Sequence, residues 1–162
     1  MSLVKTNNRW LIVTTYLLAL LLSVLPLTFE ARWLRPEFLC IFVIYWVVFS
    51  PNGSSLLLVF LMGCLQDLLE GSFLGRHALA LLCVSYLCLL FEQRFKYYVA
   101  WQQAVLVFGL VLAHQFVDHW VHSLQGASAT SFDFLMPAFT SALLWPLIWM
   151  LLDRTRVSFR VA

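Results

Sequence analysis

Residues 55–91 read SLLLVFLMGCLQDLLEGSFLGRHALALLCVSYLCLLF. Two apolar runs, 55–69 and 77–91, lie on either side of a short segment that contains Gly71 and Gly75. The strands of a membrane barrel would alternate apolar and polar residues, whereas these runs are apolar on every face, so both are predicted to be helices. The stretch thus predicts two helices joined by a tight turn.

The composition of the whole chain agrees with a membrane environment for these helices. Of its 162 residues, 62% are hydrophobic and 11% are charged, against about 45–50% and about 25% in soluble domains. A soluble globule of this composition would lack the polar groups needed to cover its surface. The aromatic content of 16% and the net charge of +2 also argue against a disordered chain and against nucleic-acid binding. We therefore expect an all-α integral membrane protein.

Further apolar segments extend towards both ends of the chain. The expected fold is a six-transmembrane-helix bundle that forms one transmembrane domain over residues 1–162. Six helices of roughly 20 residues use about 120 residues, which leaves no room for a folded soluble domain. A four-span bundle, in which residues 37–69 enter the membrane and return, is the alternative. The predicted spans cover residues 10–27, 37–50, 55–69, 77–91, 100–122 and 134–152.

Two of these spans are short. As helices, residues 37–50 and 55–69 would reach only about 21–23 Å, which is less than the hydrocarbon core of about 30 Å. Alone in lipid they would be mismatched to the bilayer. We therefore expect neighbouring helices to shield them, or the membrane to thin beside them.

Basic and aromatic residues near the span ends set the expected orientation. With six spans and both termini in the cytoplasm, only Arg32, Arg35 and Arg76 lie outside. The basic residues expected inside are Lys5, Arg9, Arg94, Lys96, Arg154, Arg156 and Arg160. Tryptophans expected to anchor the span ends at the membrane surface are Trp10, Trp33, Trp46, Trp101 and Trp120.

Glycine and one carboxylate recur at every fourth position across the turn: Gly63, Asp67, Gly71 and Gly75. On a continuous helix they would form one stripe, against which another helix could pack closely, with the carboxylate inside the contact. Alternatively, the helix ends at Glu70, with Gly71 as its C-cap and Gly75 in the turn. On either interpretation we expect these residues to serve helix packing or contact with a partner.

Asp67 is the residue in this pattern that most needs a partner. A carboxylate at the centre of a membrane helix costs about 2.5–3.5 kcal/mol on insertion scales, so we expect an ion pair or a wet cavity, with Arg76 and Arg35 as candidate partners. Hydration near the membrane surface and proton chemistry are the other interpretations. Arg35 itself precedes Pro36 and Glu37 at the start of a span, and is expected either to anchor that helix at the interface or to contact a ligand.

Four polar residues gather in the fifth span: His114, Asp118, His119 and His122. His114, Asp118 and His122 are spaced four residues apart and so share a helix face. Imidazoles with a carboxylate at that spacing could bind zinc or relay protons. No cysteine or second histidine cluster completes a tetrahedral site, so hydrogen bonds between helices are the favoured interpretation. The chain shows no nucleophile constellation or phosphate-binding loop, and we expect no catalytic residue, metal or cofactor.

These residues resemble those of the MreD family of rod shape-determining membrane proteins, in its proteobacterial branch. The central pattern, Gly63-x-x-x-Asp67-x-x-x-Gly71-x-x-x-Gly75-x-x-Ala78-Leu79, is fairly specific, and the resemblance covers nearly the whole chain. The flanking motifs are weak singly and support the resemblance jointly. They are Arg35-Pro36, Tyr45-Trp46, Tyr86-Leu87, Trp101-Gln102-Gln103 and Leu144-Trp145-Pro146.

The resemblance implies a non-enzymatic, multi-pass protein of the bacterial inner membrane that maintains rod shape within the cell-elongation complex. Its implied partners are MreC, MreB filaments, the elongation transpeptidase and the RodA glycosyltransferase of lateral peptidoglycan synthesis. The implied fold is similar to the substrate-binding subunits of energy-coupling-factor transporters. The residues expected at a partner interface, or in the helix packing that shapes it, are Arg35, Gly63, Asp67, Gly71 and Gly75.

Two other functions fit some of the same residues. A small-molecule-binding subunit of a vitamin-type transporter would use Arg35, Asp67 and Arg76 to line an outward pocket. A membrane enzyme would use His114, Asp118 and His122 of the fifth span. The first predicts a retained ligand, and the second predicts stoichiometric zinc.

Overall fold

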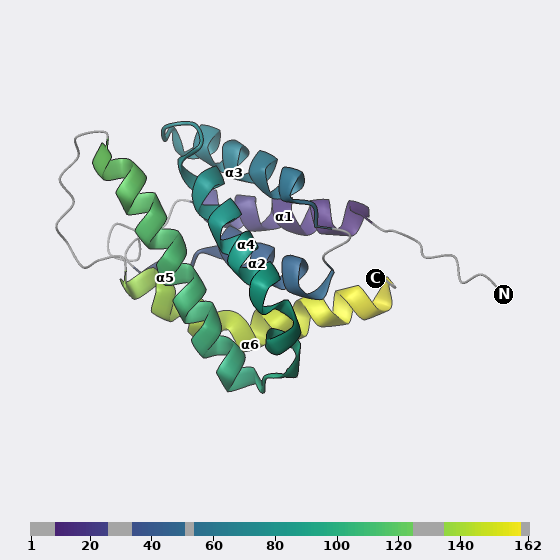
Figure 1. Cartoon of the computed structure of the whole chain (residues 1–162). Helices are drawn as coiled ribbons and strands as arrows, with labels where there is room; N and C mark the ends of the chain where they lie inside the picture. Colours follow the sequence, from purple (N-terminus) through teal and green to yellow (C-terminus); the bar gives the residue numbers. More distant parts are fainter. Residues whose placement is uncertain (1–8, 26–33, 51–53, 125–134, 160–162) are drawn as a thin grey trace.

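The computed structural model describes residues 9–25, 34–50, 54–124 and 135–159 of the chain. Over these ranges the protein consists of six α-helices (Figure 1). Each helix lies on one of the predicted spans, which confirms the all-helical fold class. The helices are α1 (Arg9–Val24), α2 (Phe38–Phe49), α3 (Leu56–Glu70), α4 (Arg76–Tyr97), α5 (Ala100–Leu124) and α6 (Leu135–Ser158).

Among the described helices, three are long and apolar enough to cross a membrane. They are α4, α5 and α6, with 22, 25 and 24 residues. Large apolar side chains, among them Leu90, Phe116 and Leu143, are exposed on the outer surface of these helices. Such a surface suits lipid and would be unfavourable in water. The structure thus supports a membrane protein, while six crossings and cytoplasmic termini stay predictions.

The short helix α2 lies at the centre of the bundle, behind α4 in Figure 1. Its ten consecutive side chains from Leu39 to Val48 are all buried, because α1, α4, α5 and α6 pack around it. With 12 residues, α2 is about 18 Å long. Its neighbours therefore provide the shielding that the sequence predicted for this short span.

Trp46 was expected to anchor α2 at the membrane surface, and this prediction is wrong. The indole is fully buried, and its Nε1 donates a hydrogen bond to Thr15 Oγ1 of α1 at 2.9 Å. Because α2 is enclosed on all sides, both the apolar body and the polar N–H of Trp46 are satisfied inside the bundle. Trp10, Trp101 and Trp120 are exposed, and Trp33 lies outside the described residues.

The helices α4 and α6 continue past the ends of their apolar spans, to Tyr97 and Ser158. Ion pairs between successive turns support both extensions. Lys96 Nζ lies 2.5 Å from Glu92 Oε1, and Arg156 Nη2 lies 2.9 Å from Asp153 Oδ1. Charged residues thus mark the end of the apolar part of each helix and not the end of the helix, since such pairs favour further turns.

Two of the weaker sequence motifs meet at the end of the bundle where α4 is followed by α5. Trp145 Nε1 of α6 donates to Gln103 Oε1 of α5 at 3.1 Å. The Gln103 amide nitrogen in turn donates to the carbonyl oxygens of Phe95 and Tyr98 at 3.3 and 3.0 Å. Gln103 therefore joins α6 to the connection between α4 and α5.

Candidate functional site

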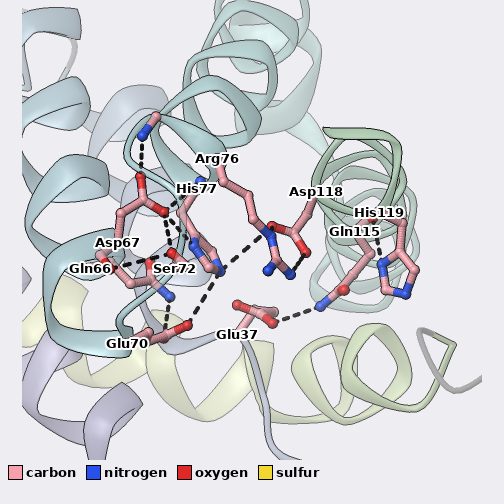
Figure 2. A network of polar contacts seen from close by, with 11 residues as sticks. Glu37, Gln66, Asp67, Glu70, Ser72, Arg76, His77, Gln115, Asp118 and His119 are labelled. Atoms are coloured by element: carbon pink, nitrogen blue, oxygen red, sulfur yellow. Dashed lines mark hydrogen bonds and ion pairs between the residues drawn. The ribbon is translucent and has the colours of Figure 1, made fainter. Parts of the chain in front are cut away.

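A polar network lies at the opposite end of the bundle, where α3, α4, α5 and the start of α2 come together (Figure 2). Its side chains include Glu37, Asp67, Arg76, His77 and Asp118. Ionisable residues inside a membrane protein are costly unless they are paired, so each requires a named partner. The hydrogen-bond and ion-pair partners of these side chains determine which chemistry is possible at this end of the bundle.

Asp67, in the last turn of α3, is fully buried and holds the turn between α3 and α4. Its Oδ1 accepts hydrogen bonds from Ser72 Oγ at 2.9 Å, the His77 backbone N–H at 3.0 Å and His77 Nδ1 at 2.8 Å. Its Oδ2 accepts from the Gly75 backbone N–H at 2.8 Å. The first amides of a helix lack partners within it and attract negative charge, so Asp67 acts as a cap supplied to α4 by the preceding helix.

Two glycines make this turn possible. Gly71 is the C-cap of α3 with φ +66°, and Gly75 precedes α4 with φ +99°. Both values lie in the left-handed region, which residues other than glycine disfavour. The backbone N–H groups of Gly71 and Ser72 donate to the Asp67 carbonyl oxygen, which ends α3 in a Schellman-type cap. The alternative of a C-cap at Gly71 is therefore what the structure shows, and the continuous stripe is wrong.

Gly63 lies within α3 and lets α4 approach closely. A Cβ added to Gly63 would lie 2.8 Å from the Ala78 backbone nitrogen and closer still to the Ala78 Cα. No side chain could move aside to relieve that clash, because the backbone of α4 itself occupies the space. The glycine pattern thus performs two tasks: Gly63 sets the spacing of α3 and α4, and the other two glycines form the turn between them.

Arg76 pairs with Asp118 of α5 and not with Asp67, so this expected partnership is wrong. The guanidinium Nε and Nη2 each lie 2.5 Å from one Asp118 carboxylate oxygen, a bidentate geometry that gives both energy and direction. The Asp118 side chain is 6% exposed and that of Arg76 is 21% exposed. The pair joins the first turn of α4 to α5.

The partner of Asp67 is instead His77, which the sequence analysis did not predict. Its Nε2 lies 3.5 Å from Glu70 Oε2 and 3.7 Å from Asp118 Oδ1. The imidazole therefore stands among three carboxylates from α3 and α5, as Figure 2 shows. A histidine directly after Arg76 at the start of a span was the available signal for this role.

Glu37 and Arg35 occupy the start of α2. Gln115 Nε2 donates to Glu37 Oε1 at 2.6 Å, and the Glu37 backbone N–H donates to Ser141 Oγ of α6 at 3.0 Å. Arg35 Nη2 donates to the carbonyl oxygen of Leu22 in α1 at 3.3 Å, so Arg35 is not the partner of Asp67 either. Glu37 ties α2 to α5 and α6, while Arg35 ties the same segment to α1.

The polar residues of the fifth span do not act as one group. Asp118 faces Arg76, and His119 Nδ1 lies 3.2 Å from the Gln115 carbonyl oxygen of its own helix. His114 is buried, with neither ring nitrogen hydrogen-bonded, and its ring centre lies 6.1 Å from that of His77. Within the described part of the chain, no three histidine, cysteine, aspartate or glutamate side chains converge in a way that could hold a metal ion.

The outer surface is apolar, and the buried ionisable residues of the network, Asp67, His77 and Asp118, gather at one end of the bundle. These features define the class as a membrane-embedded helical protein. A family model described as rod shape-determining protein MreD matches residues 4–155, nearly the whole chain. The chain therefore belongs to the MreD family of rod shape-determining proteins. The rod shape-determining protein MreD of Haemophilus influenzae is 29% identical over 145 residues, which cover 90% of both chains. No solved structure matches this chain.

Proposed function

We propose that this protein is a non-enzymatic, multi-pass component of the bacterial inner membrane that acts in the cell-elongation complex. Membership of a rod shape-determining family supports the role in cell shape. In this proposal the protein binds MreC and, with it, links MreB filaments to the elongation transpeptidase and the RodA glycosyltransferase. Both termini face the cytoplasm, and the fold is similar to that of the substrate-binding subunits of energy-coupling-factor transporters.

The observation that most supports contact over chemistry is the state of the buried carboxylates. Both oxygens of Asp67 accept hydrogen bonds from Ser72, Gly75 and His77, and both oxygens of Asp118 face Arg76. A general base must be within hydrogen-bond reach of a substrate proton. Here the donors that hold each carboxylate belong to the protein itself, which suits a structural role.

The surface of α3 is the part of the bundle that best suits a partner helix. Leu57, Leu61 and Leu68 are exposed on this helix at spacings of four and seven residues, and therefore on one face. The helix is 15 residues long, about 22 Å, which is shorter than the hydrocarbon core of about 30 Å. In lipid, the polar backbone groups at its ends would therefore lie inside that core. A transmembrane helix of MreC packed on this face would cover them. In this proposal Gly63, Asp67, Gly71 and Gly75 shape the interface from within, and Arg35 fixes the neighbouring end of α1.

The vitamin-type transporter subunit is the other candidate. Pockets for such small molecules are typically about 300–1,000 Å³ in volume. The cavity at this end of the bundle, lined by Arg35, Glu37, Glu70 and His77 among others, measures about 130 Å³. The polar cavity by itself is smaller than this range, so it could hold a small charged group but not a whole vitamin.

Depletion of the protein in its native cell, followed by microscopy, tests the cell-shape role. We expect depleted cells to become round, and cells that stay rod-shaped would contradict the proposal. Rescue by the wild-type chain, but not by a chain that fails to bind MreC, would connect the phenotype to the partner.

Co-purification with MreC tests the proposed interface. We expect Leu61→Trp to reduce the amount of MreC recovered, because a bulky ring would hold the partner helix away from α3. Gly71→Leu should reduce it too, by deforming the turn behind that face. Leu143→Trp, at an exposed position on α6, is the control. Equal recovery with Leu61→Trp and Leu143→Trp would argue against α3 as the docking helix.

A further inference from the structure

A small polar cavity and an apolar groove are lined by neighbouring residues at one end of the bundle. The cavity, of about 130 Å³, is lined by side chains that include Ser23, Arg35, Glu37, Gln66, Glu70 and His77. At roughly 30 Å³ per water molecule it has room for about four waters, or for a small charged group of similar size. Among the described residues, its walls carry the Arg35 guanidinium, the Glu37 and Glu70 carboxylates and the His77 imidazole.

The groove lies between α1 and α3 and measures about 460 Å³. Its walls are hydrocarbon side chains, among them Leu17, Leu21 and Val24 of α1 and Leu65 and Leu69 of α3. A groove of this kind between two membrane helices offers contacts to an acyl chain along its length.

Consecutive residues line the two spaces. On α1, Ser23 lines the cavity and Val24 lines the groove. On α3, Gln66 and Glu70 line the cavity, while Leu65 and Leu69 line the groove. The groove therefore runs along the same turns of α1 and α3 whose polar sides border the cavity. A molecule with a charged end and a hydrocarbon chain could occupy both at once.

The charges of the cavity select among such molecules. Arg35 has five N–H donors and uses one of them on the Leu22 carbonyl, which leaves others for a phosphate. Glu37 and Glu70 supply two carboxylates, each with one oxygen hydrogen-bonded to a glutamine amide. Outside the cavity, Asp118 is paired with Arg76. His77, which lines the cavity, pairs with Asp67 through Nδ1, and its Nε2 lies 3.5 Å from the second Glu70 oxygen. The lining therefore favours a ligand that carries both an anion and a cation.

We propose that the ends of α1 and α3 bind one phospholipid of the ethanolamine type. Its ammonium group lies beside Glu37 and Glu70, its phosphate contacts Arg35, and one acyl chain lies in the groove between α1 and α3. The cavity accommodates the ammonium and its short carbon link. An anionic phosphatidylglycerol offers the phosphate without the cation, so the two carboxylates would face an uncharged glycerol. This inference does not depend on MreC.

Native mass spectrometry of the full-length protein, purified in detergent and delipidated, tests the proposal. Dioleoyl phosphatidylethanolamine and dioleoyl phosphatidylglycerol are added at equal concentration. We expect one phosphatidylethanolamine to be retained in about tenfold preference over phosphatidylglycerol. The ammonium group makes hydrogen bonds to the carboxylates that phosphatidylglycerol lacks, and one such bond to a charged group is strong enough to give a factor of this size. Equal retention of the two lipids would overturn the proposal.

Two charge variants locate the headgroup. Glu70→Gln keeps an acceptor for Gln66 but removes the negative charge, and should abolish the preference for phosphatidylethanolamine. Arg35→Gln should reduce retention of both lipids about tenfold. Glu92→Gln, at the far end of α4, is the control and should bind as the wild type does. If both cavity variants retain lipid as the control does, the headgroup is not bound there.

Groove variants and a soluble headgroup locate the acyl chain. Leu65→Trp should fill the groove and reduce retention, whereas Leu143→Trp on α6 should not. Soluble glycerophosphoethanolamine, which has no acyl chains, should fail to displace the lipid at the same concentration. Displacement by it, or full retention by Leu65→Trp, would show that the groove contributes nothing. Circular dichroism and size-exclusion chromatography of each variant confirm that losses do not arise from unfolding.

Discussion

The Asp67 carboxylate on α3 accepts hydrogen bonds from both the backbone N–H and the ring Nδ1 of His77 on α4, at 3.0 and 2.8 Å. One side chain thus caps the helix that follows it and holds that helix's second residue in place. The turn between α3 and α4 is organised around this contact, and the remaining polar network extends from it towards α5.

Replacing Asp67 should destabilise the protein strongly. Asp67→Ala leaves the buried His77 N–H without an acceptor, at about 1–3 kcal/mol, and the partly buried Gly75 N–H as well, at a smaller cost. Asp67→Asn keeps one acceptor oxygen and should cost less. Ser72→Ala removes a single donor and should cost about 1 kcal/mol. Unfolding in detergent, followed by circular dichroism during titration with SDS, measures the order. A stability of Asp67→Ala equal to that of the wild type would show that the cap does not matter.

Gly63→Ala should lower stability by about 1–3 kcal/mol, as overpacking in a core does. The added Cβ would clash with backbone atoms of Ala78, so combining it with Ala78→Gly should not restore stability. Gly109→Ala is the matched control, since nothing lies within 4 Å of a Cβ there. The free energy of unfolding of Gly109→Ala should be unchanged or slightly higher, because alanine favours a helix. Rescue by Ala78→Gly would mean that the clash is with the Ala78 side chain and not with its backbone.

Gly71 should tolerate asparagine better than alanine. Its φ of +66° costs an ordinary side chain about 1–2 kcal/mol, and asparagine visits this conformation more readily. We expect the free energy of unfolding to fall in the order Gly71, Gly71→Asn, Gly71→Ala. Space is not the reason, since nothing lies within 4 Å of a Cβ at Gly71. Similar values for the two variants would point away from backbone strain.

Breaking the pair between Arg76 and Asp118 should cost about 3 kcal/mol, because it leaves one charge without its partner in a mostly buried place. The double variant Arg76→Ala, Asp118→Ala should be more stable than the sum of the single variants implies. Lys96→Ala, which breaks a more exposed pair within α4, should cost at most about 0.5 kcal/mol. Strict additivity in the double-mutant cycle would refute a direct interaction.

Hydropathy predicted where the helices lie, but not which polar groups pair. Arg76 and His77 are consecutive, and successive residues on a helix point about 100° apart. One of them therefore faces α5 and the other faces α3, which reverses the pairing expected from charge alone. The place of Asp118 beside α4 depends on how α5 crosses the bundle, and no spacing within one helix contains that information.

The same limit explains Trp46. The sequence places it near the end of an apolar segment, where an indole commonly sits at the membrane surface. Whether a helix lies at the centre or the edge of a bundle depends on its neighbours, and α2 is enclosed by four of them. The short length of α2 was a usable signal of shielding, whereas the exact depth of its tryptophan was not.

The enclosure of α2 also constrains how the protein is made. Ribosomes deliver α2 to the membrane before α4, α5 and α6 have been synthesised, so its apolar side chains first meet lipid or the insertion machinery. Only when the C-terminal helices arrive can the chain close around it. Assembly of this bundle is therefore completed late in synthesis, and a chain interrupted before α6 would leave its central helix partly unwrapped.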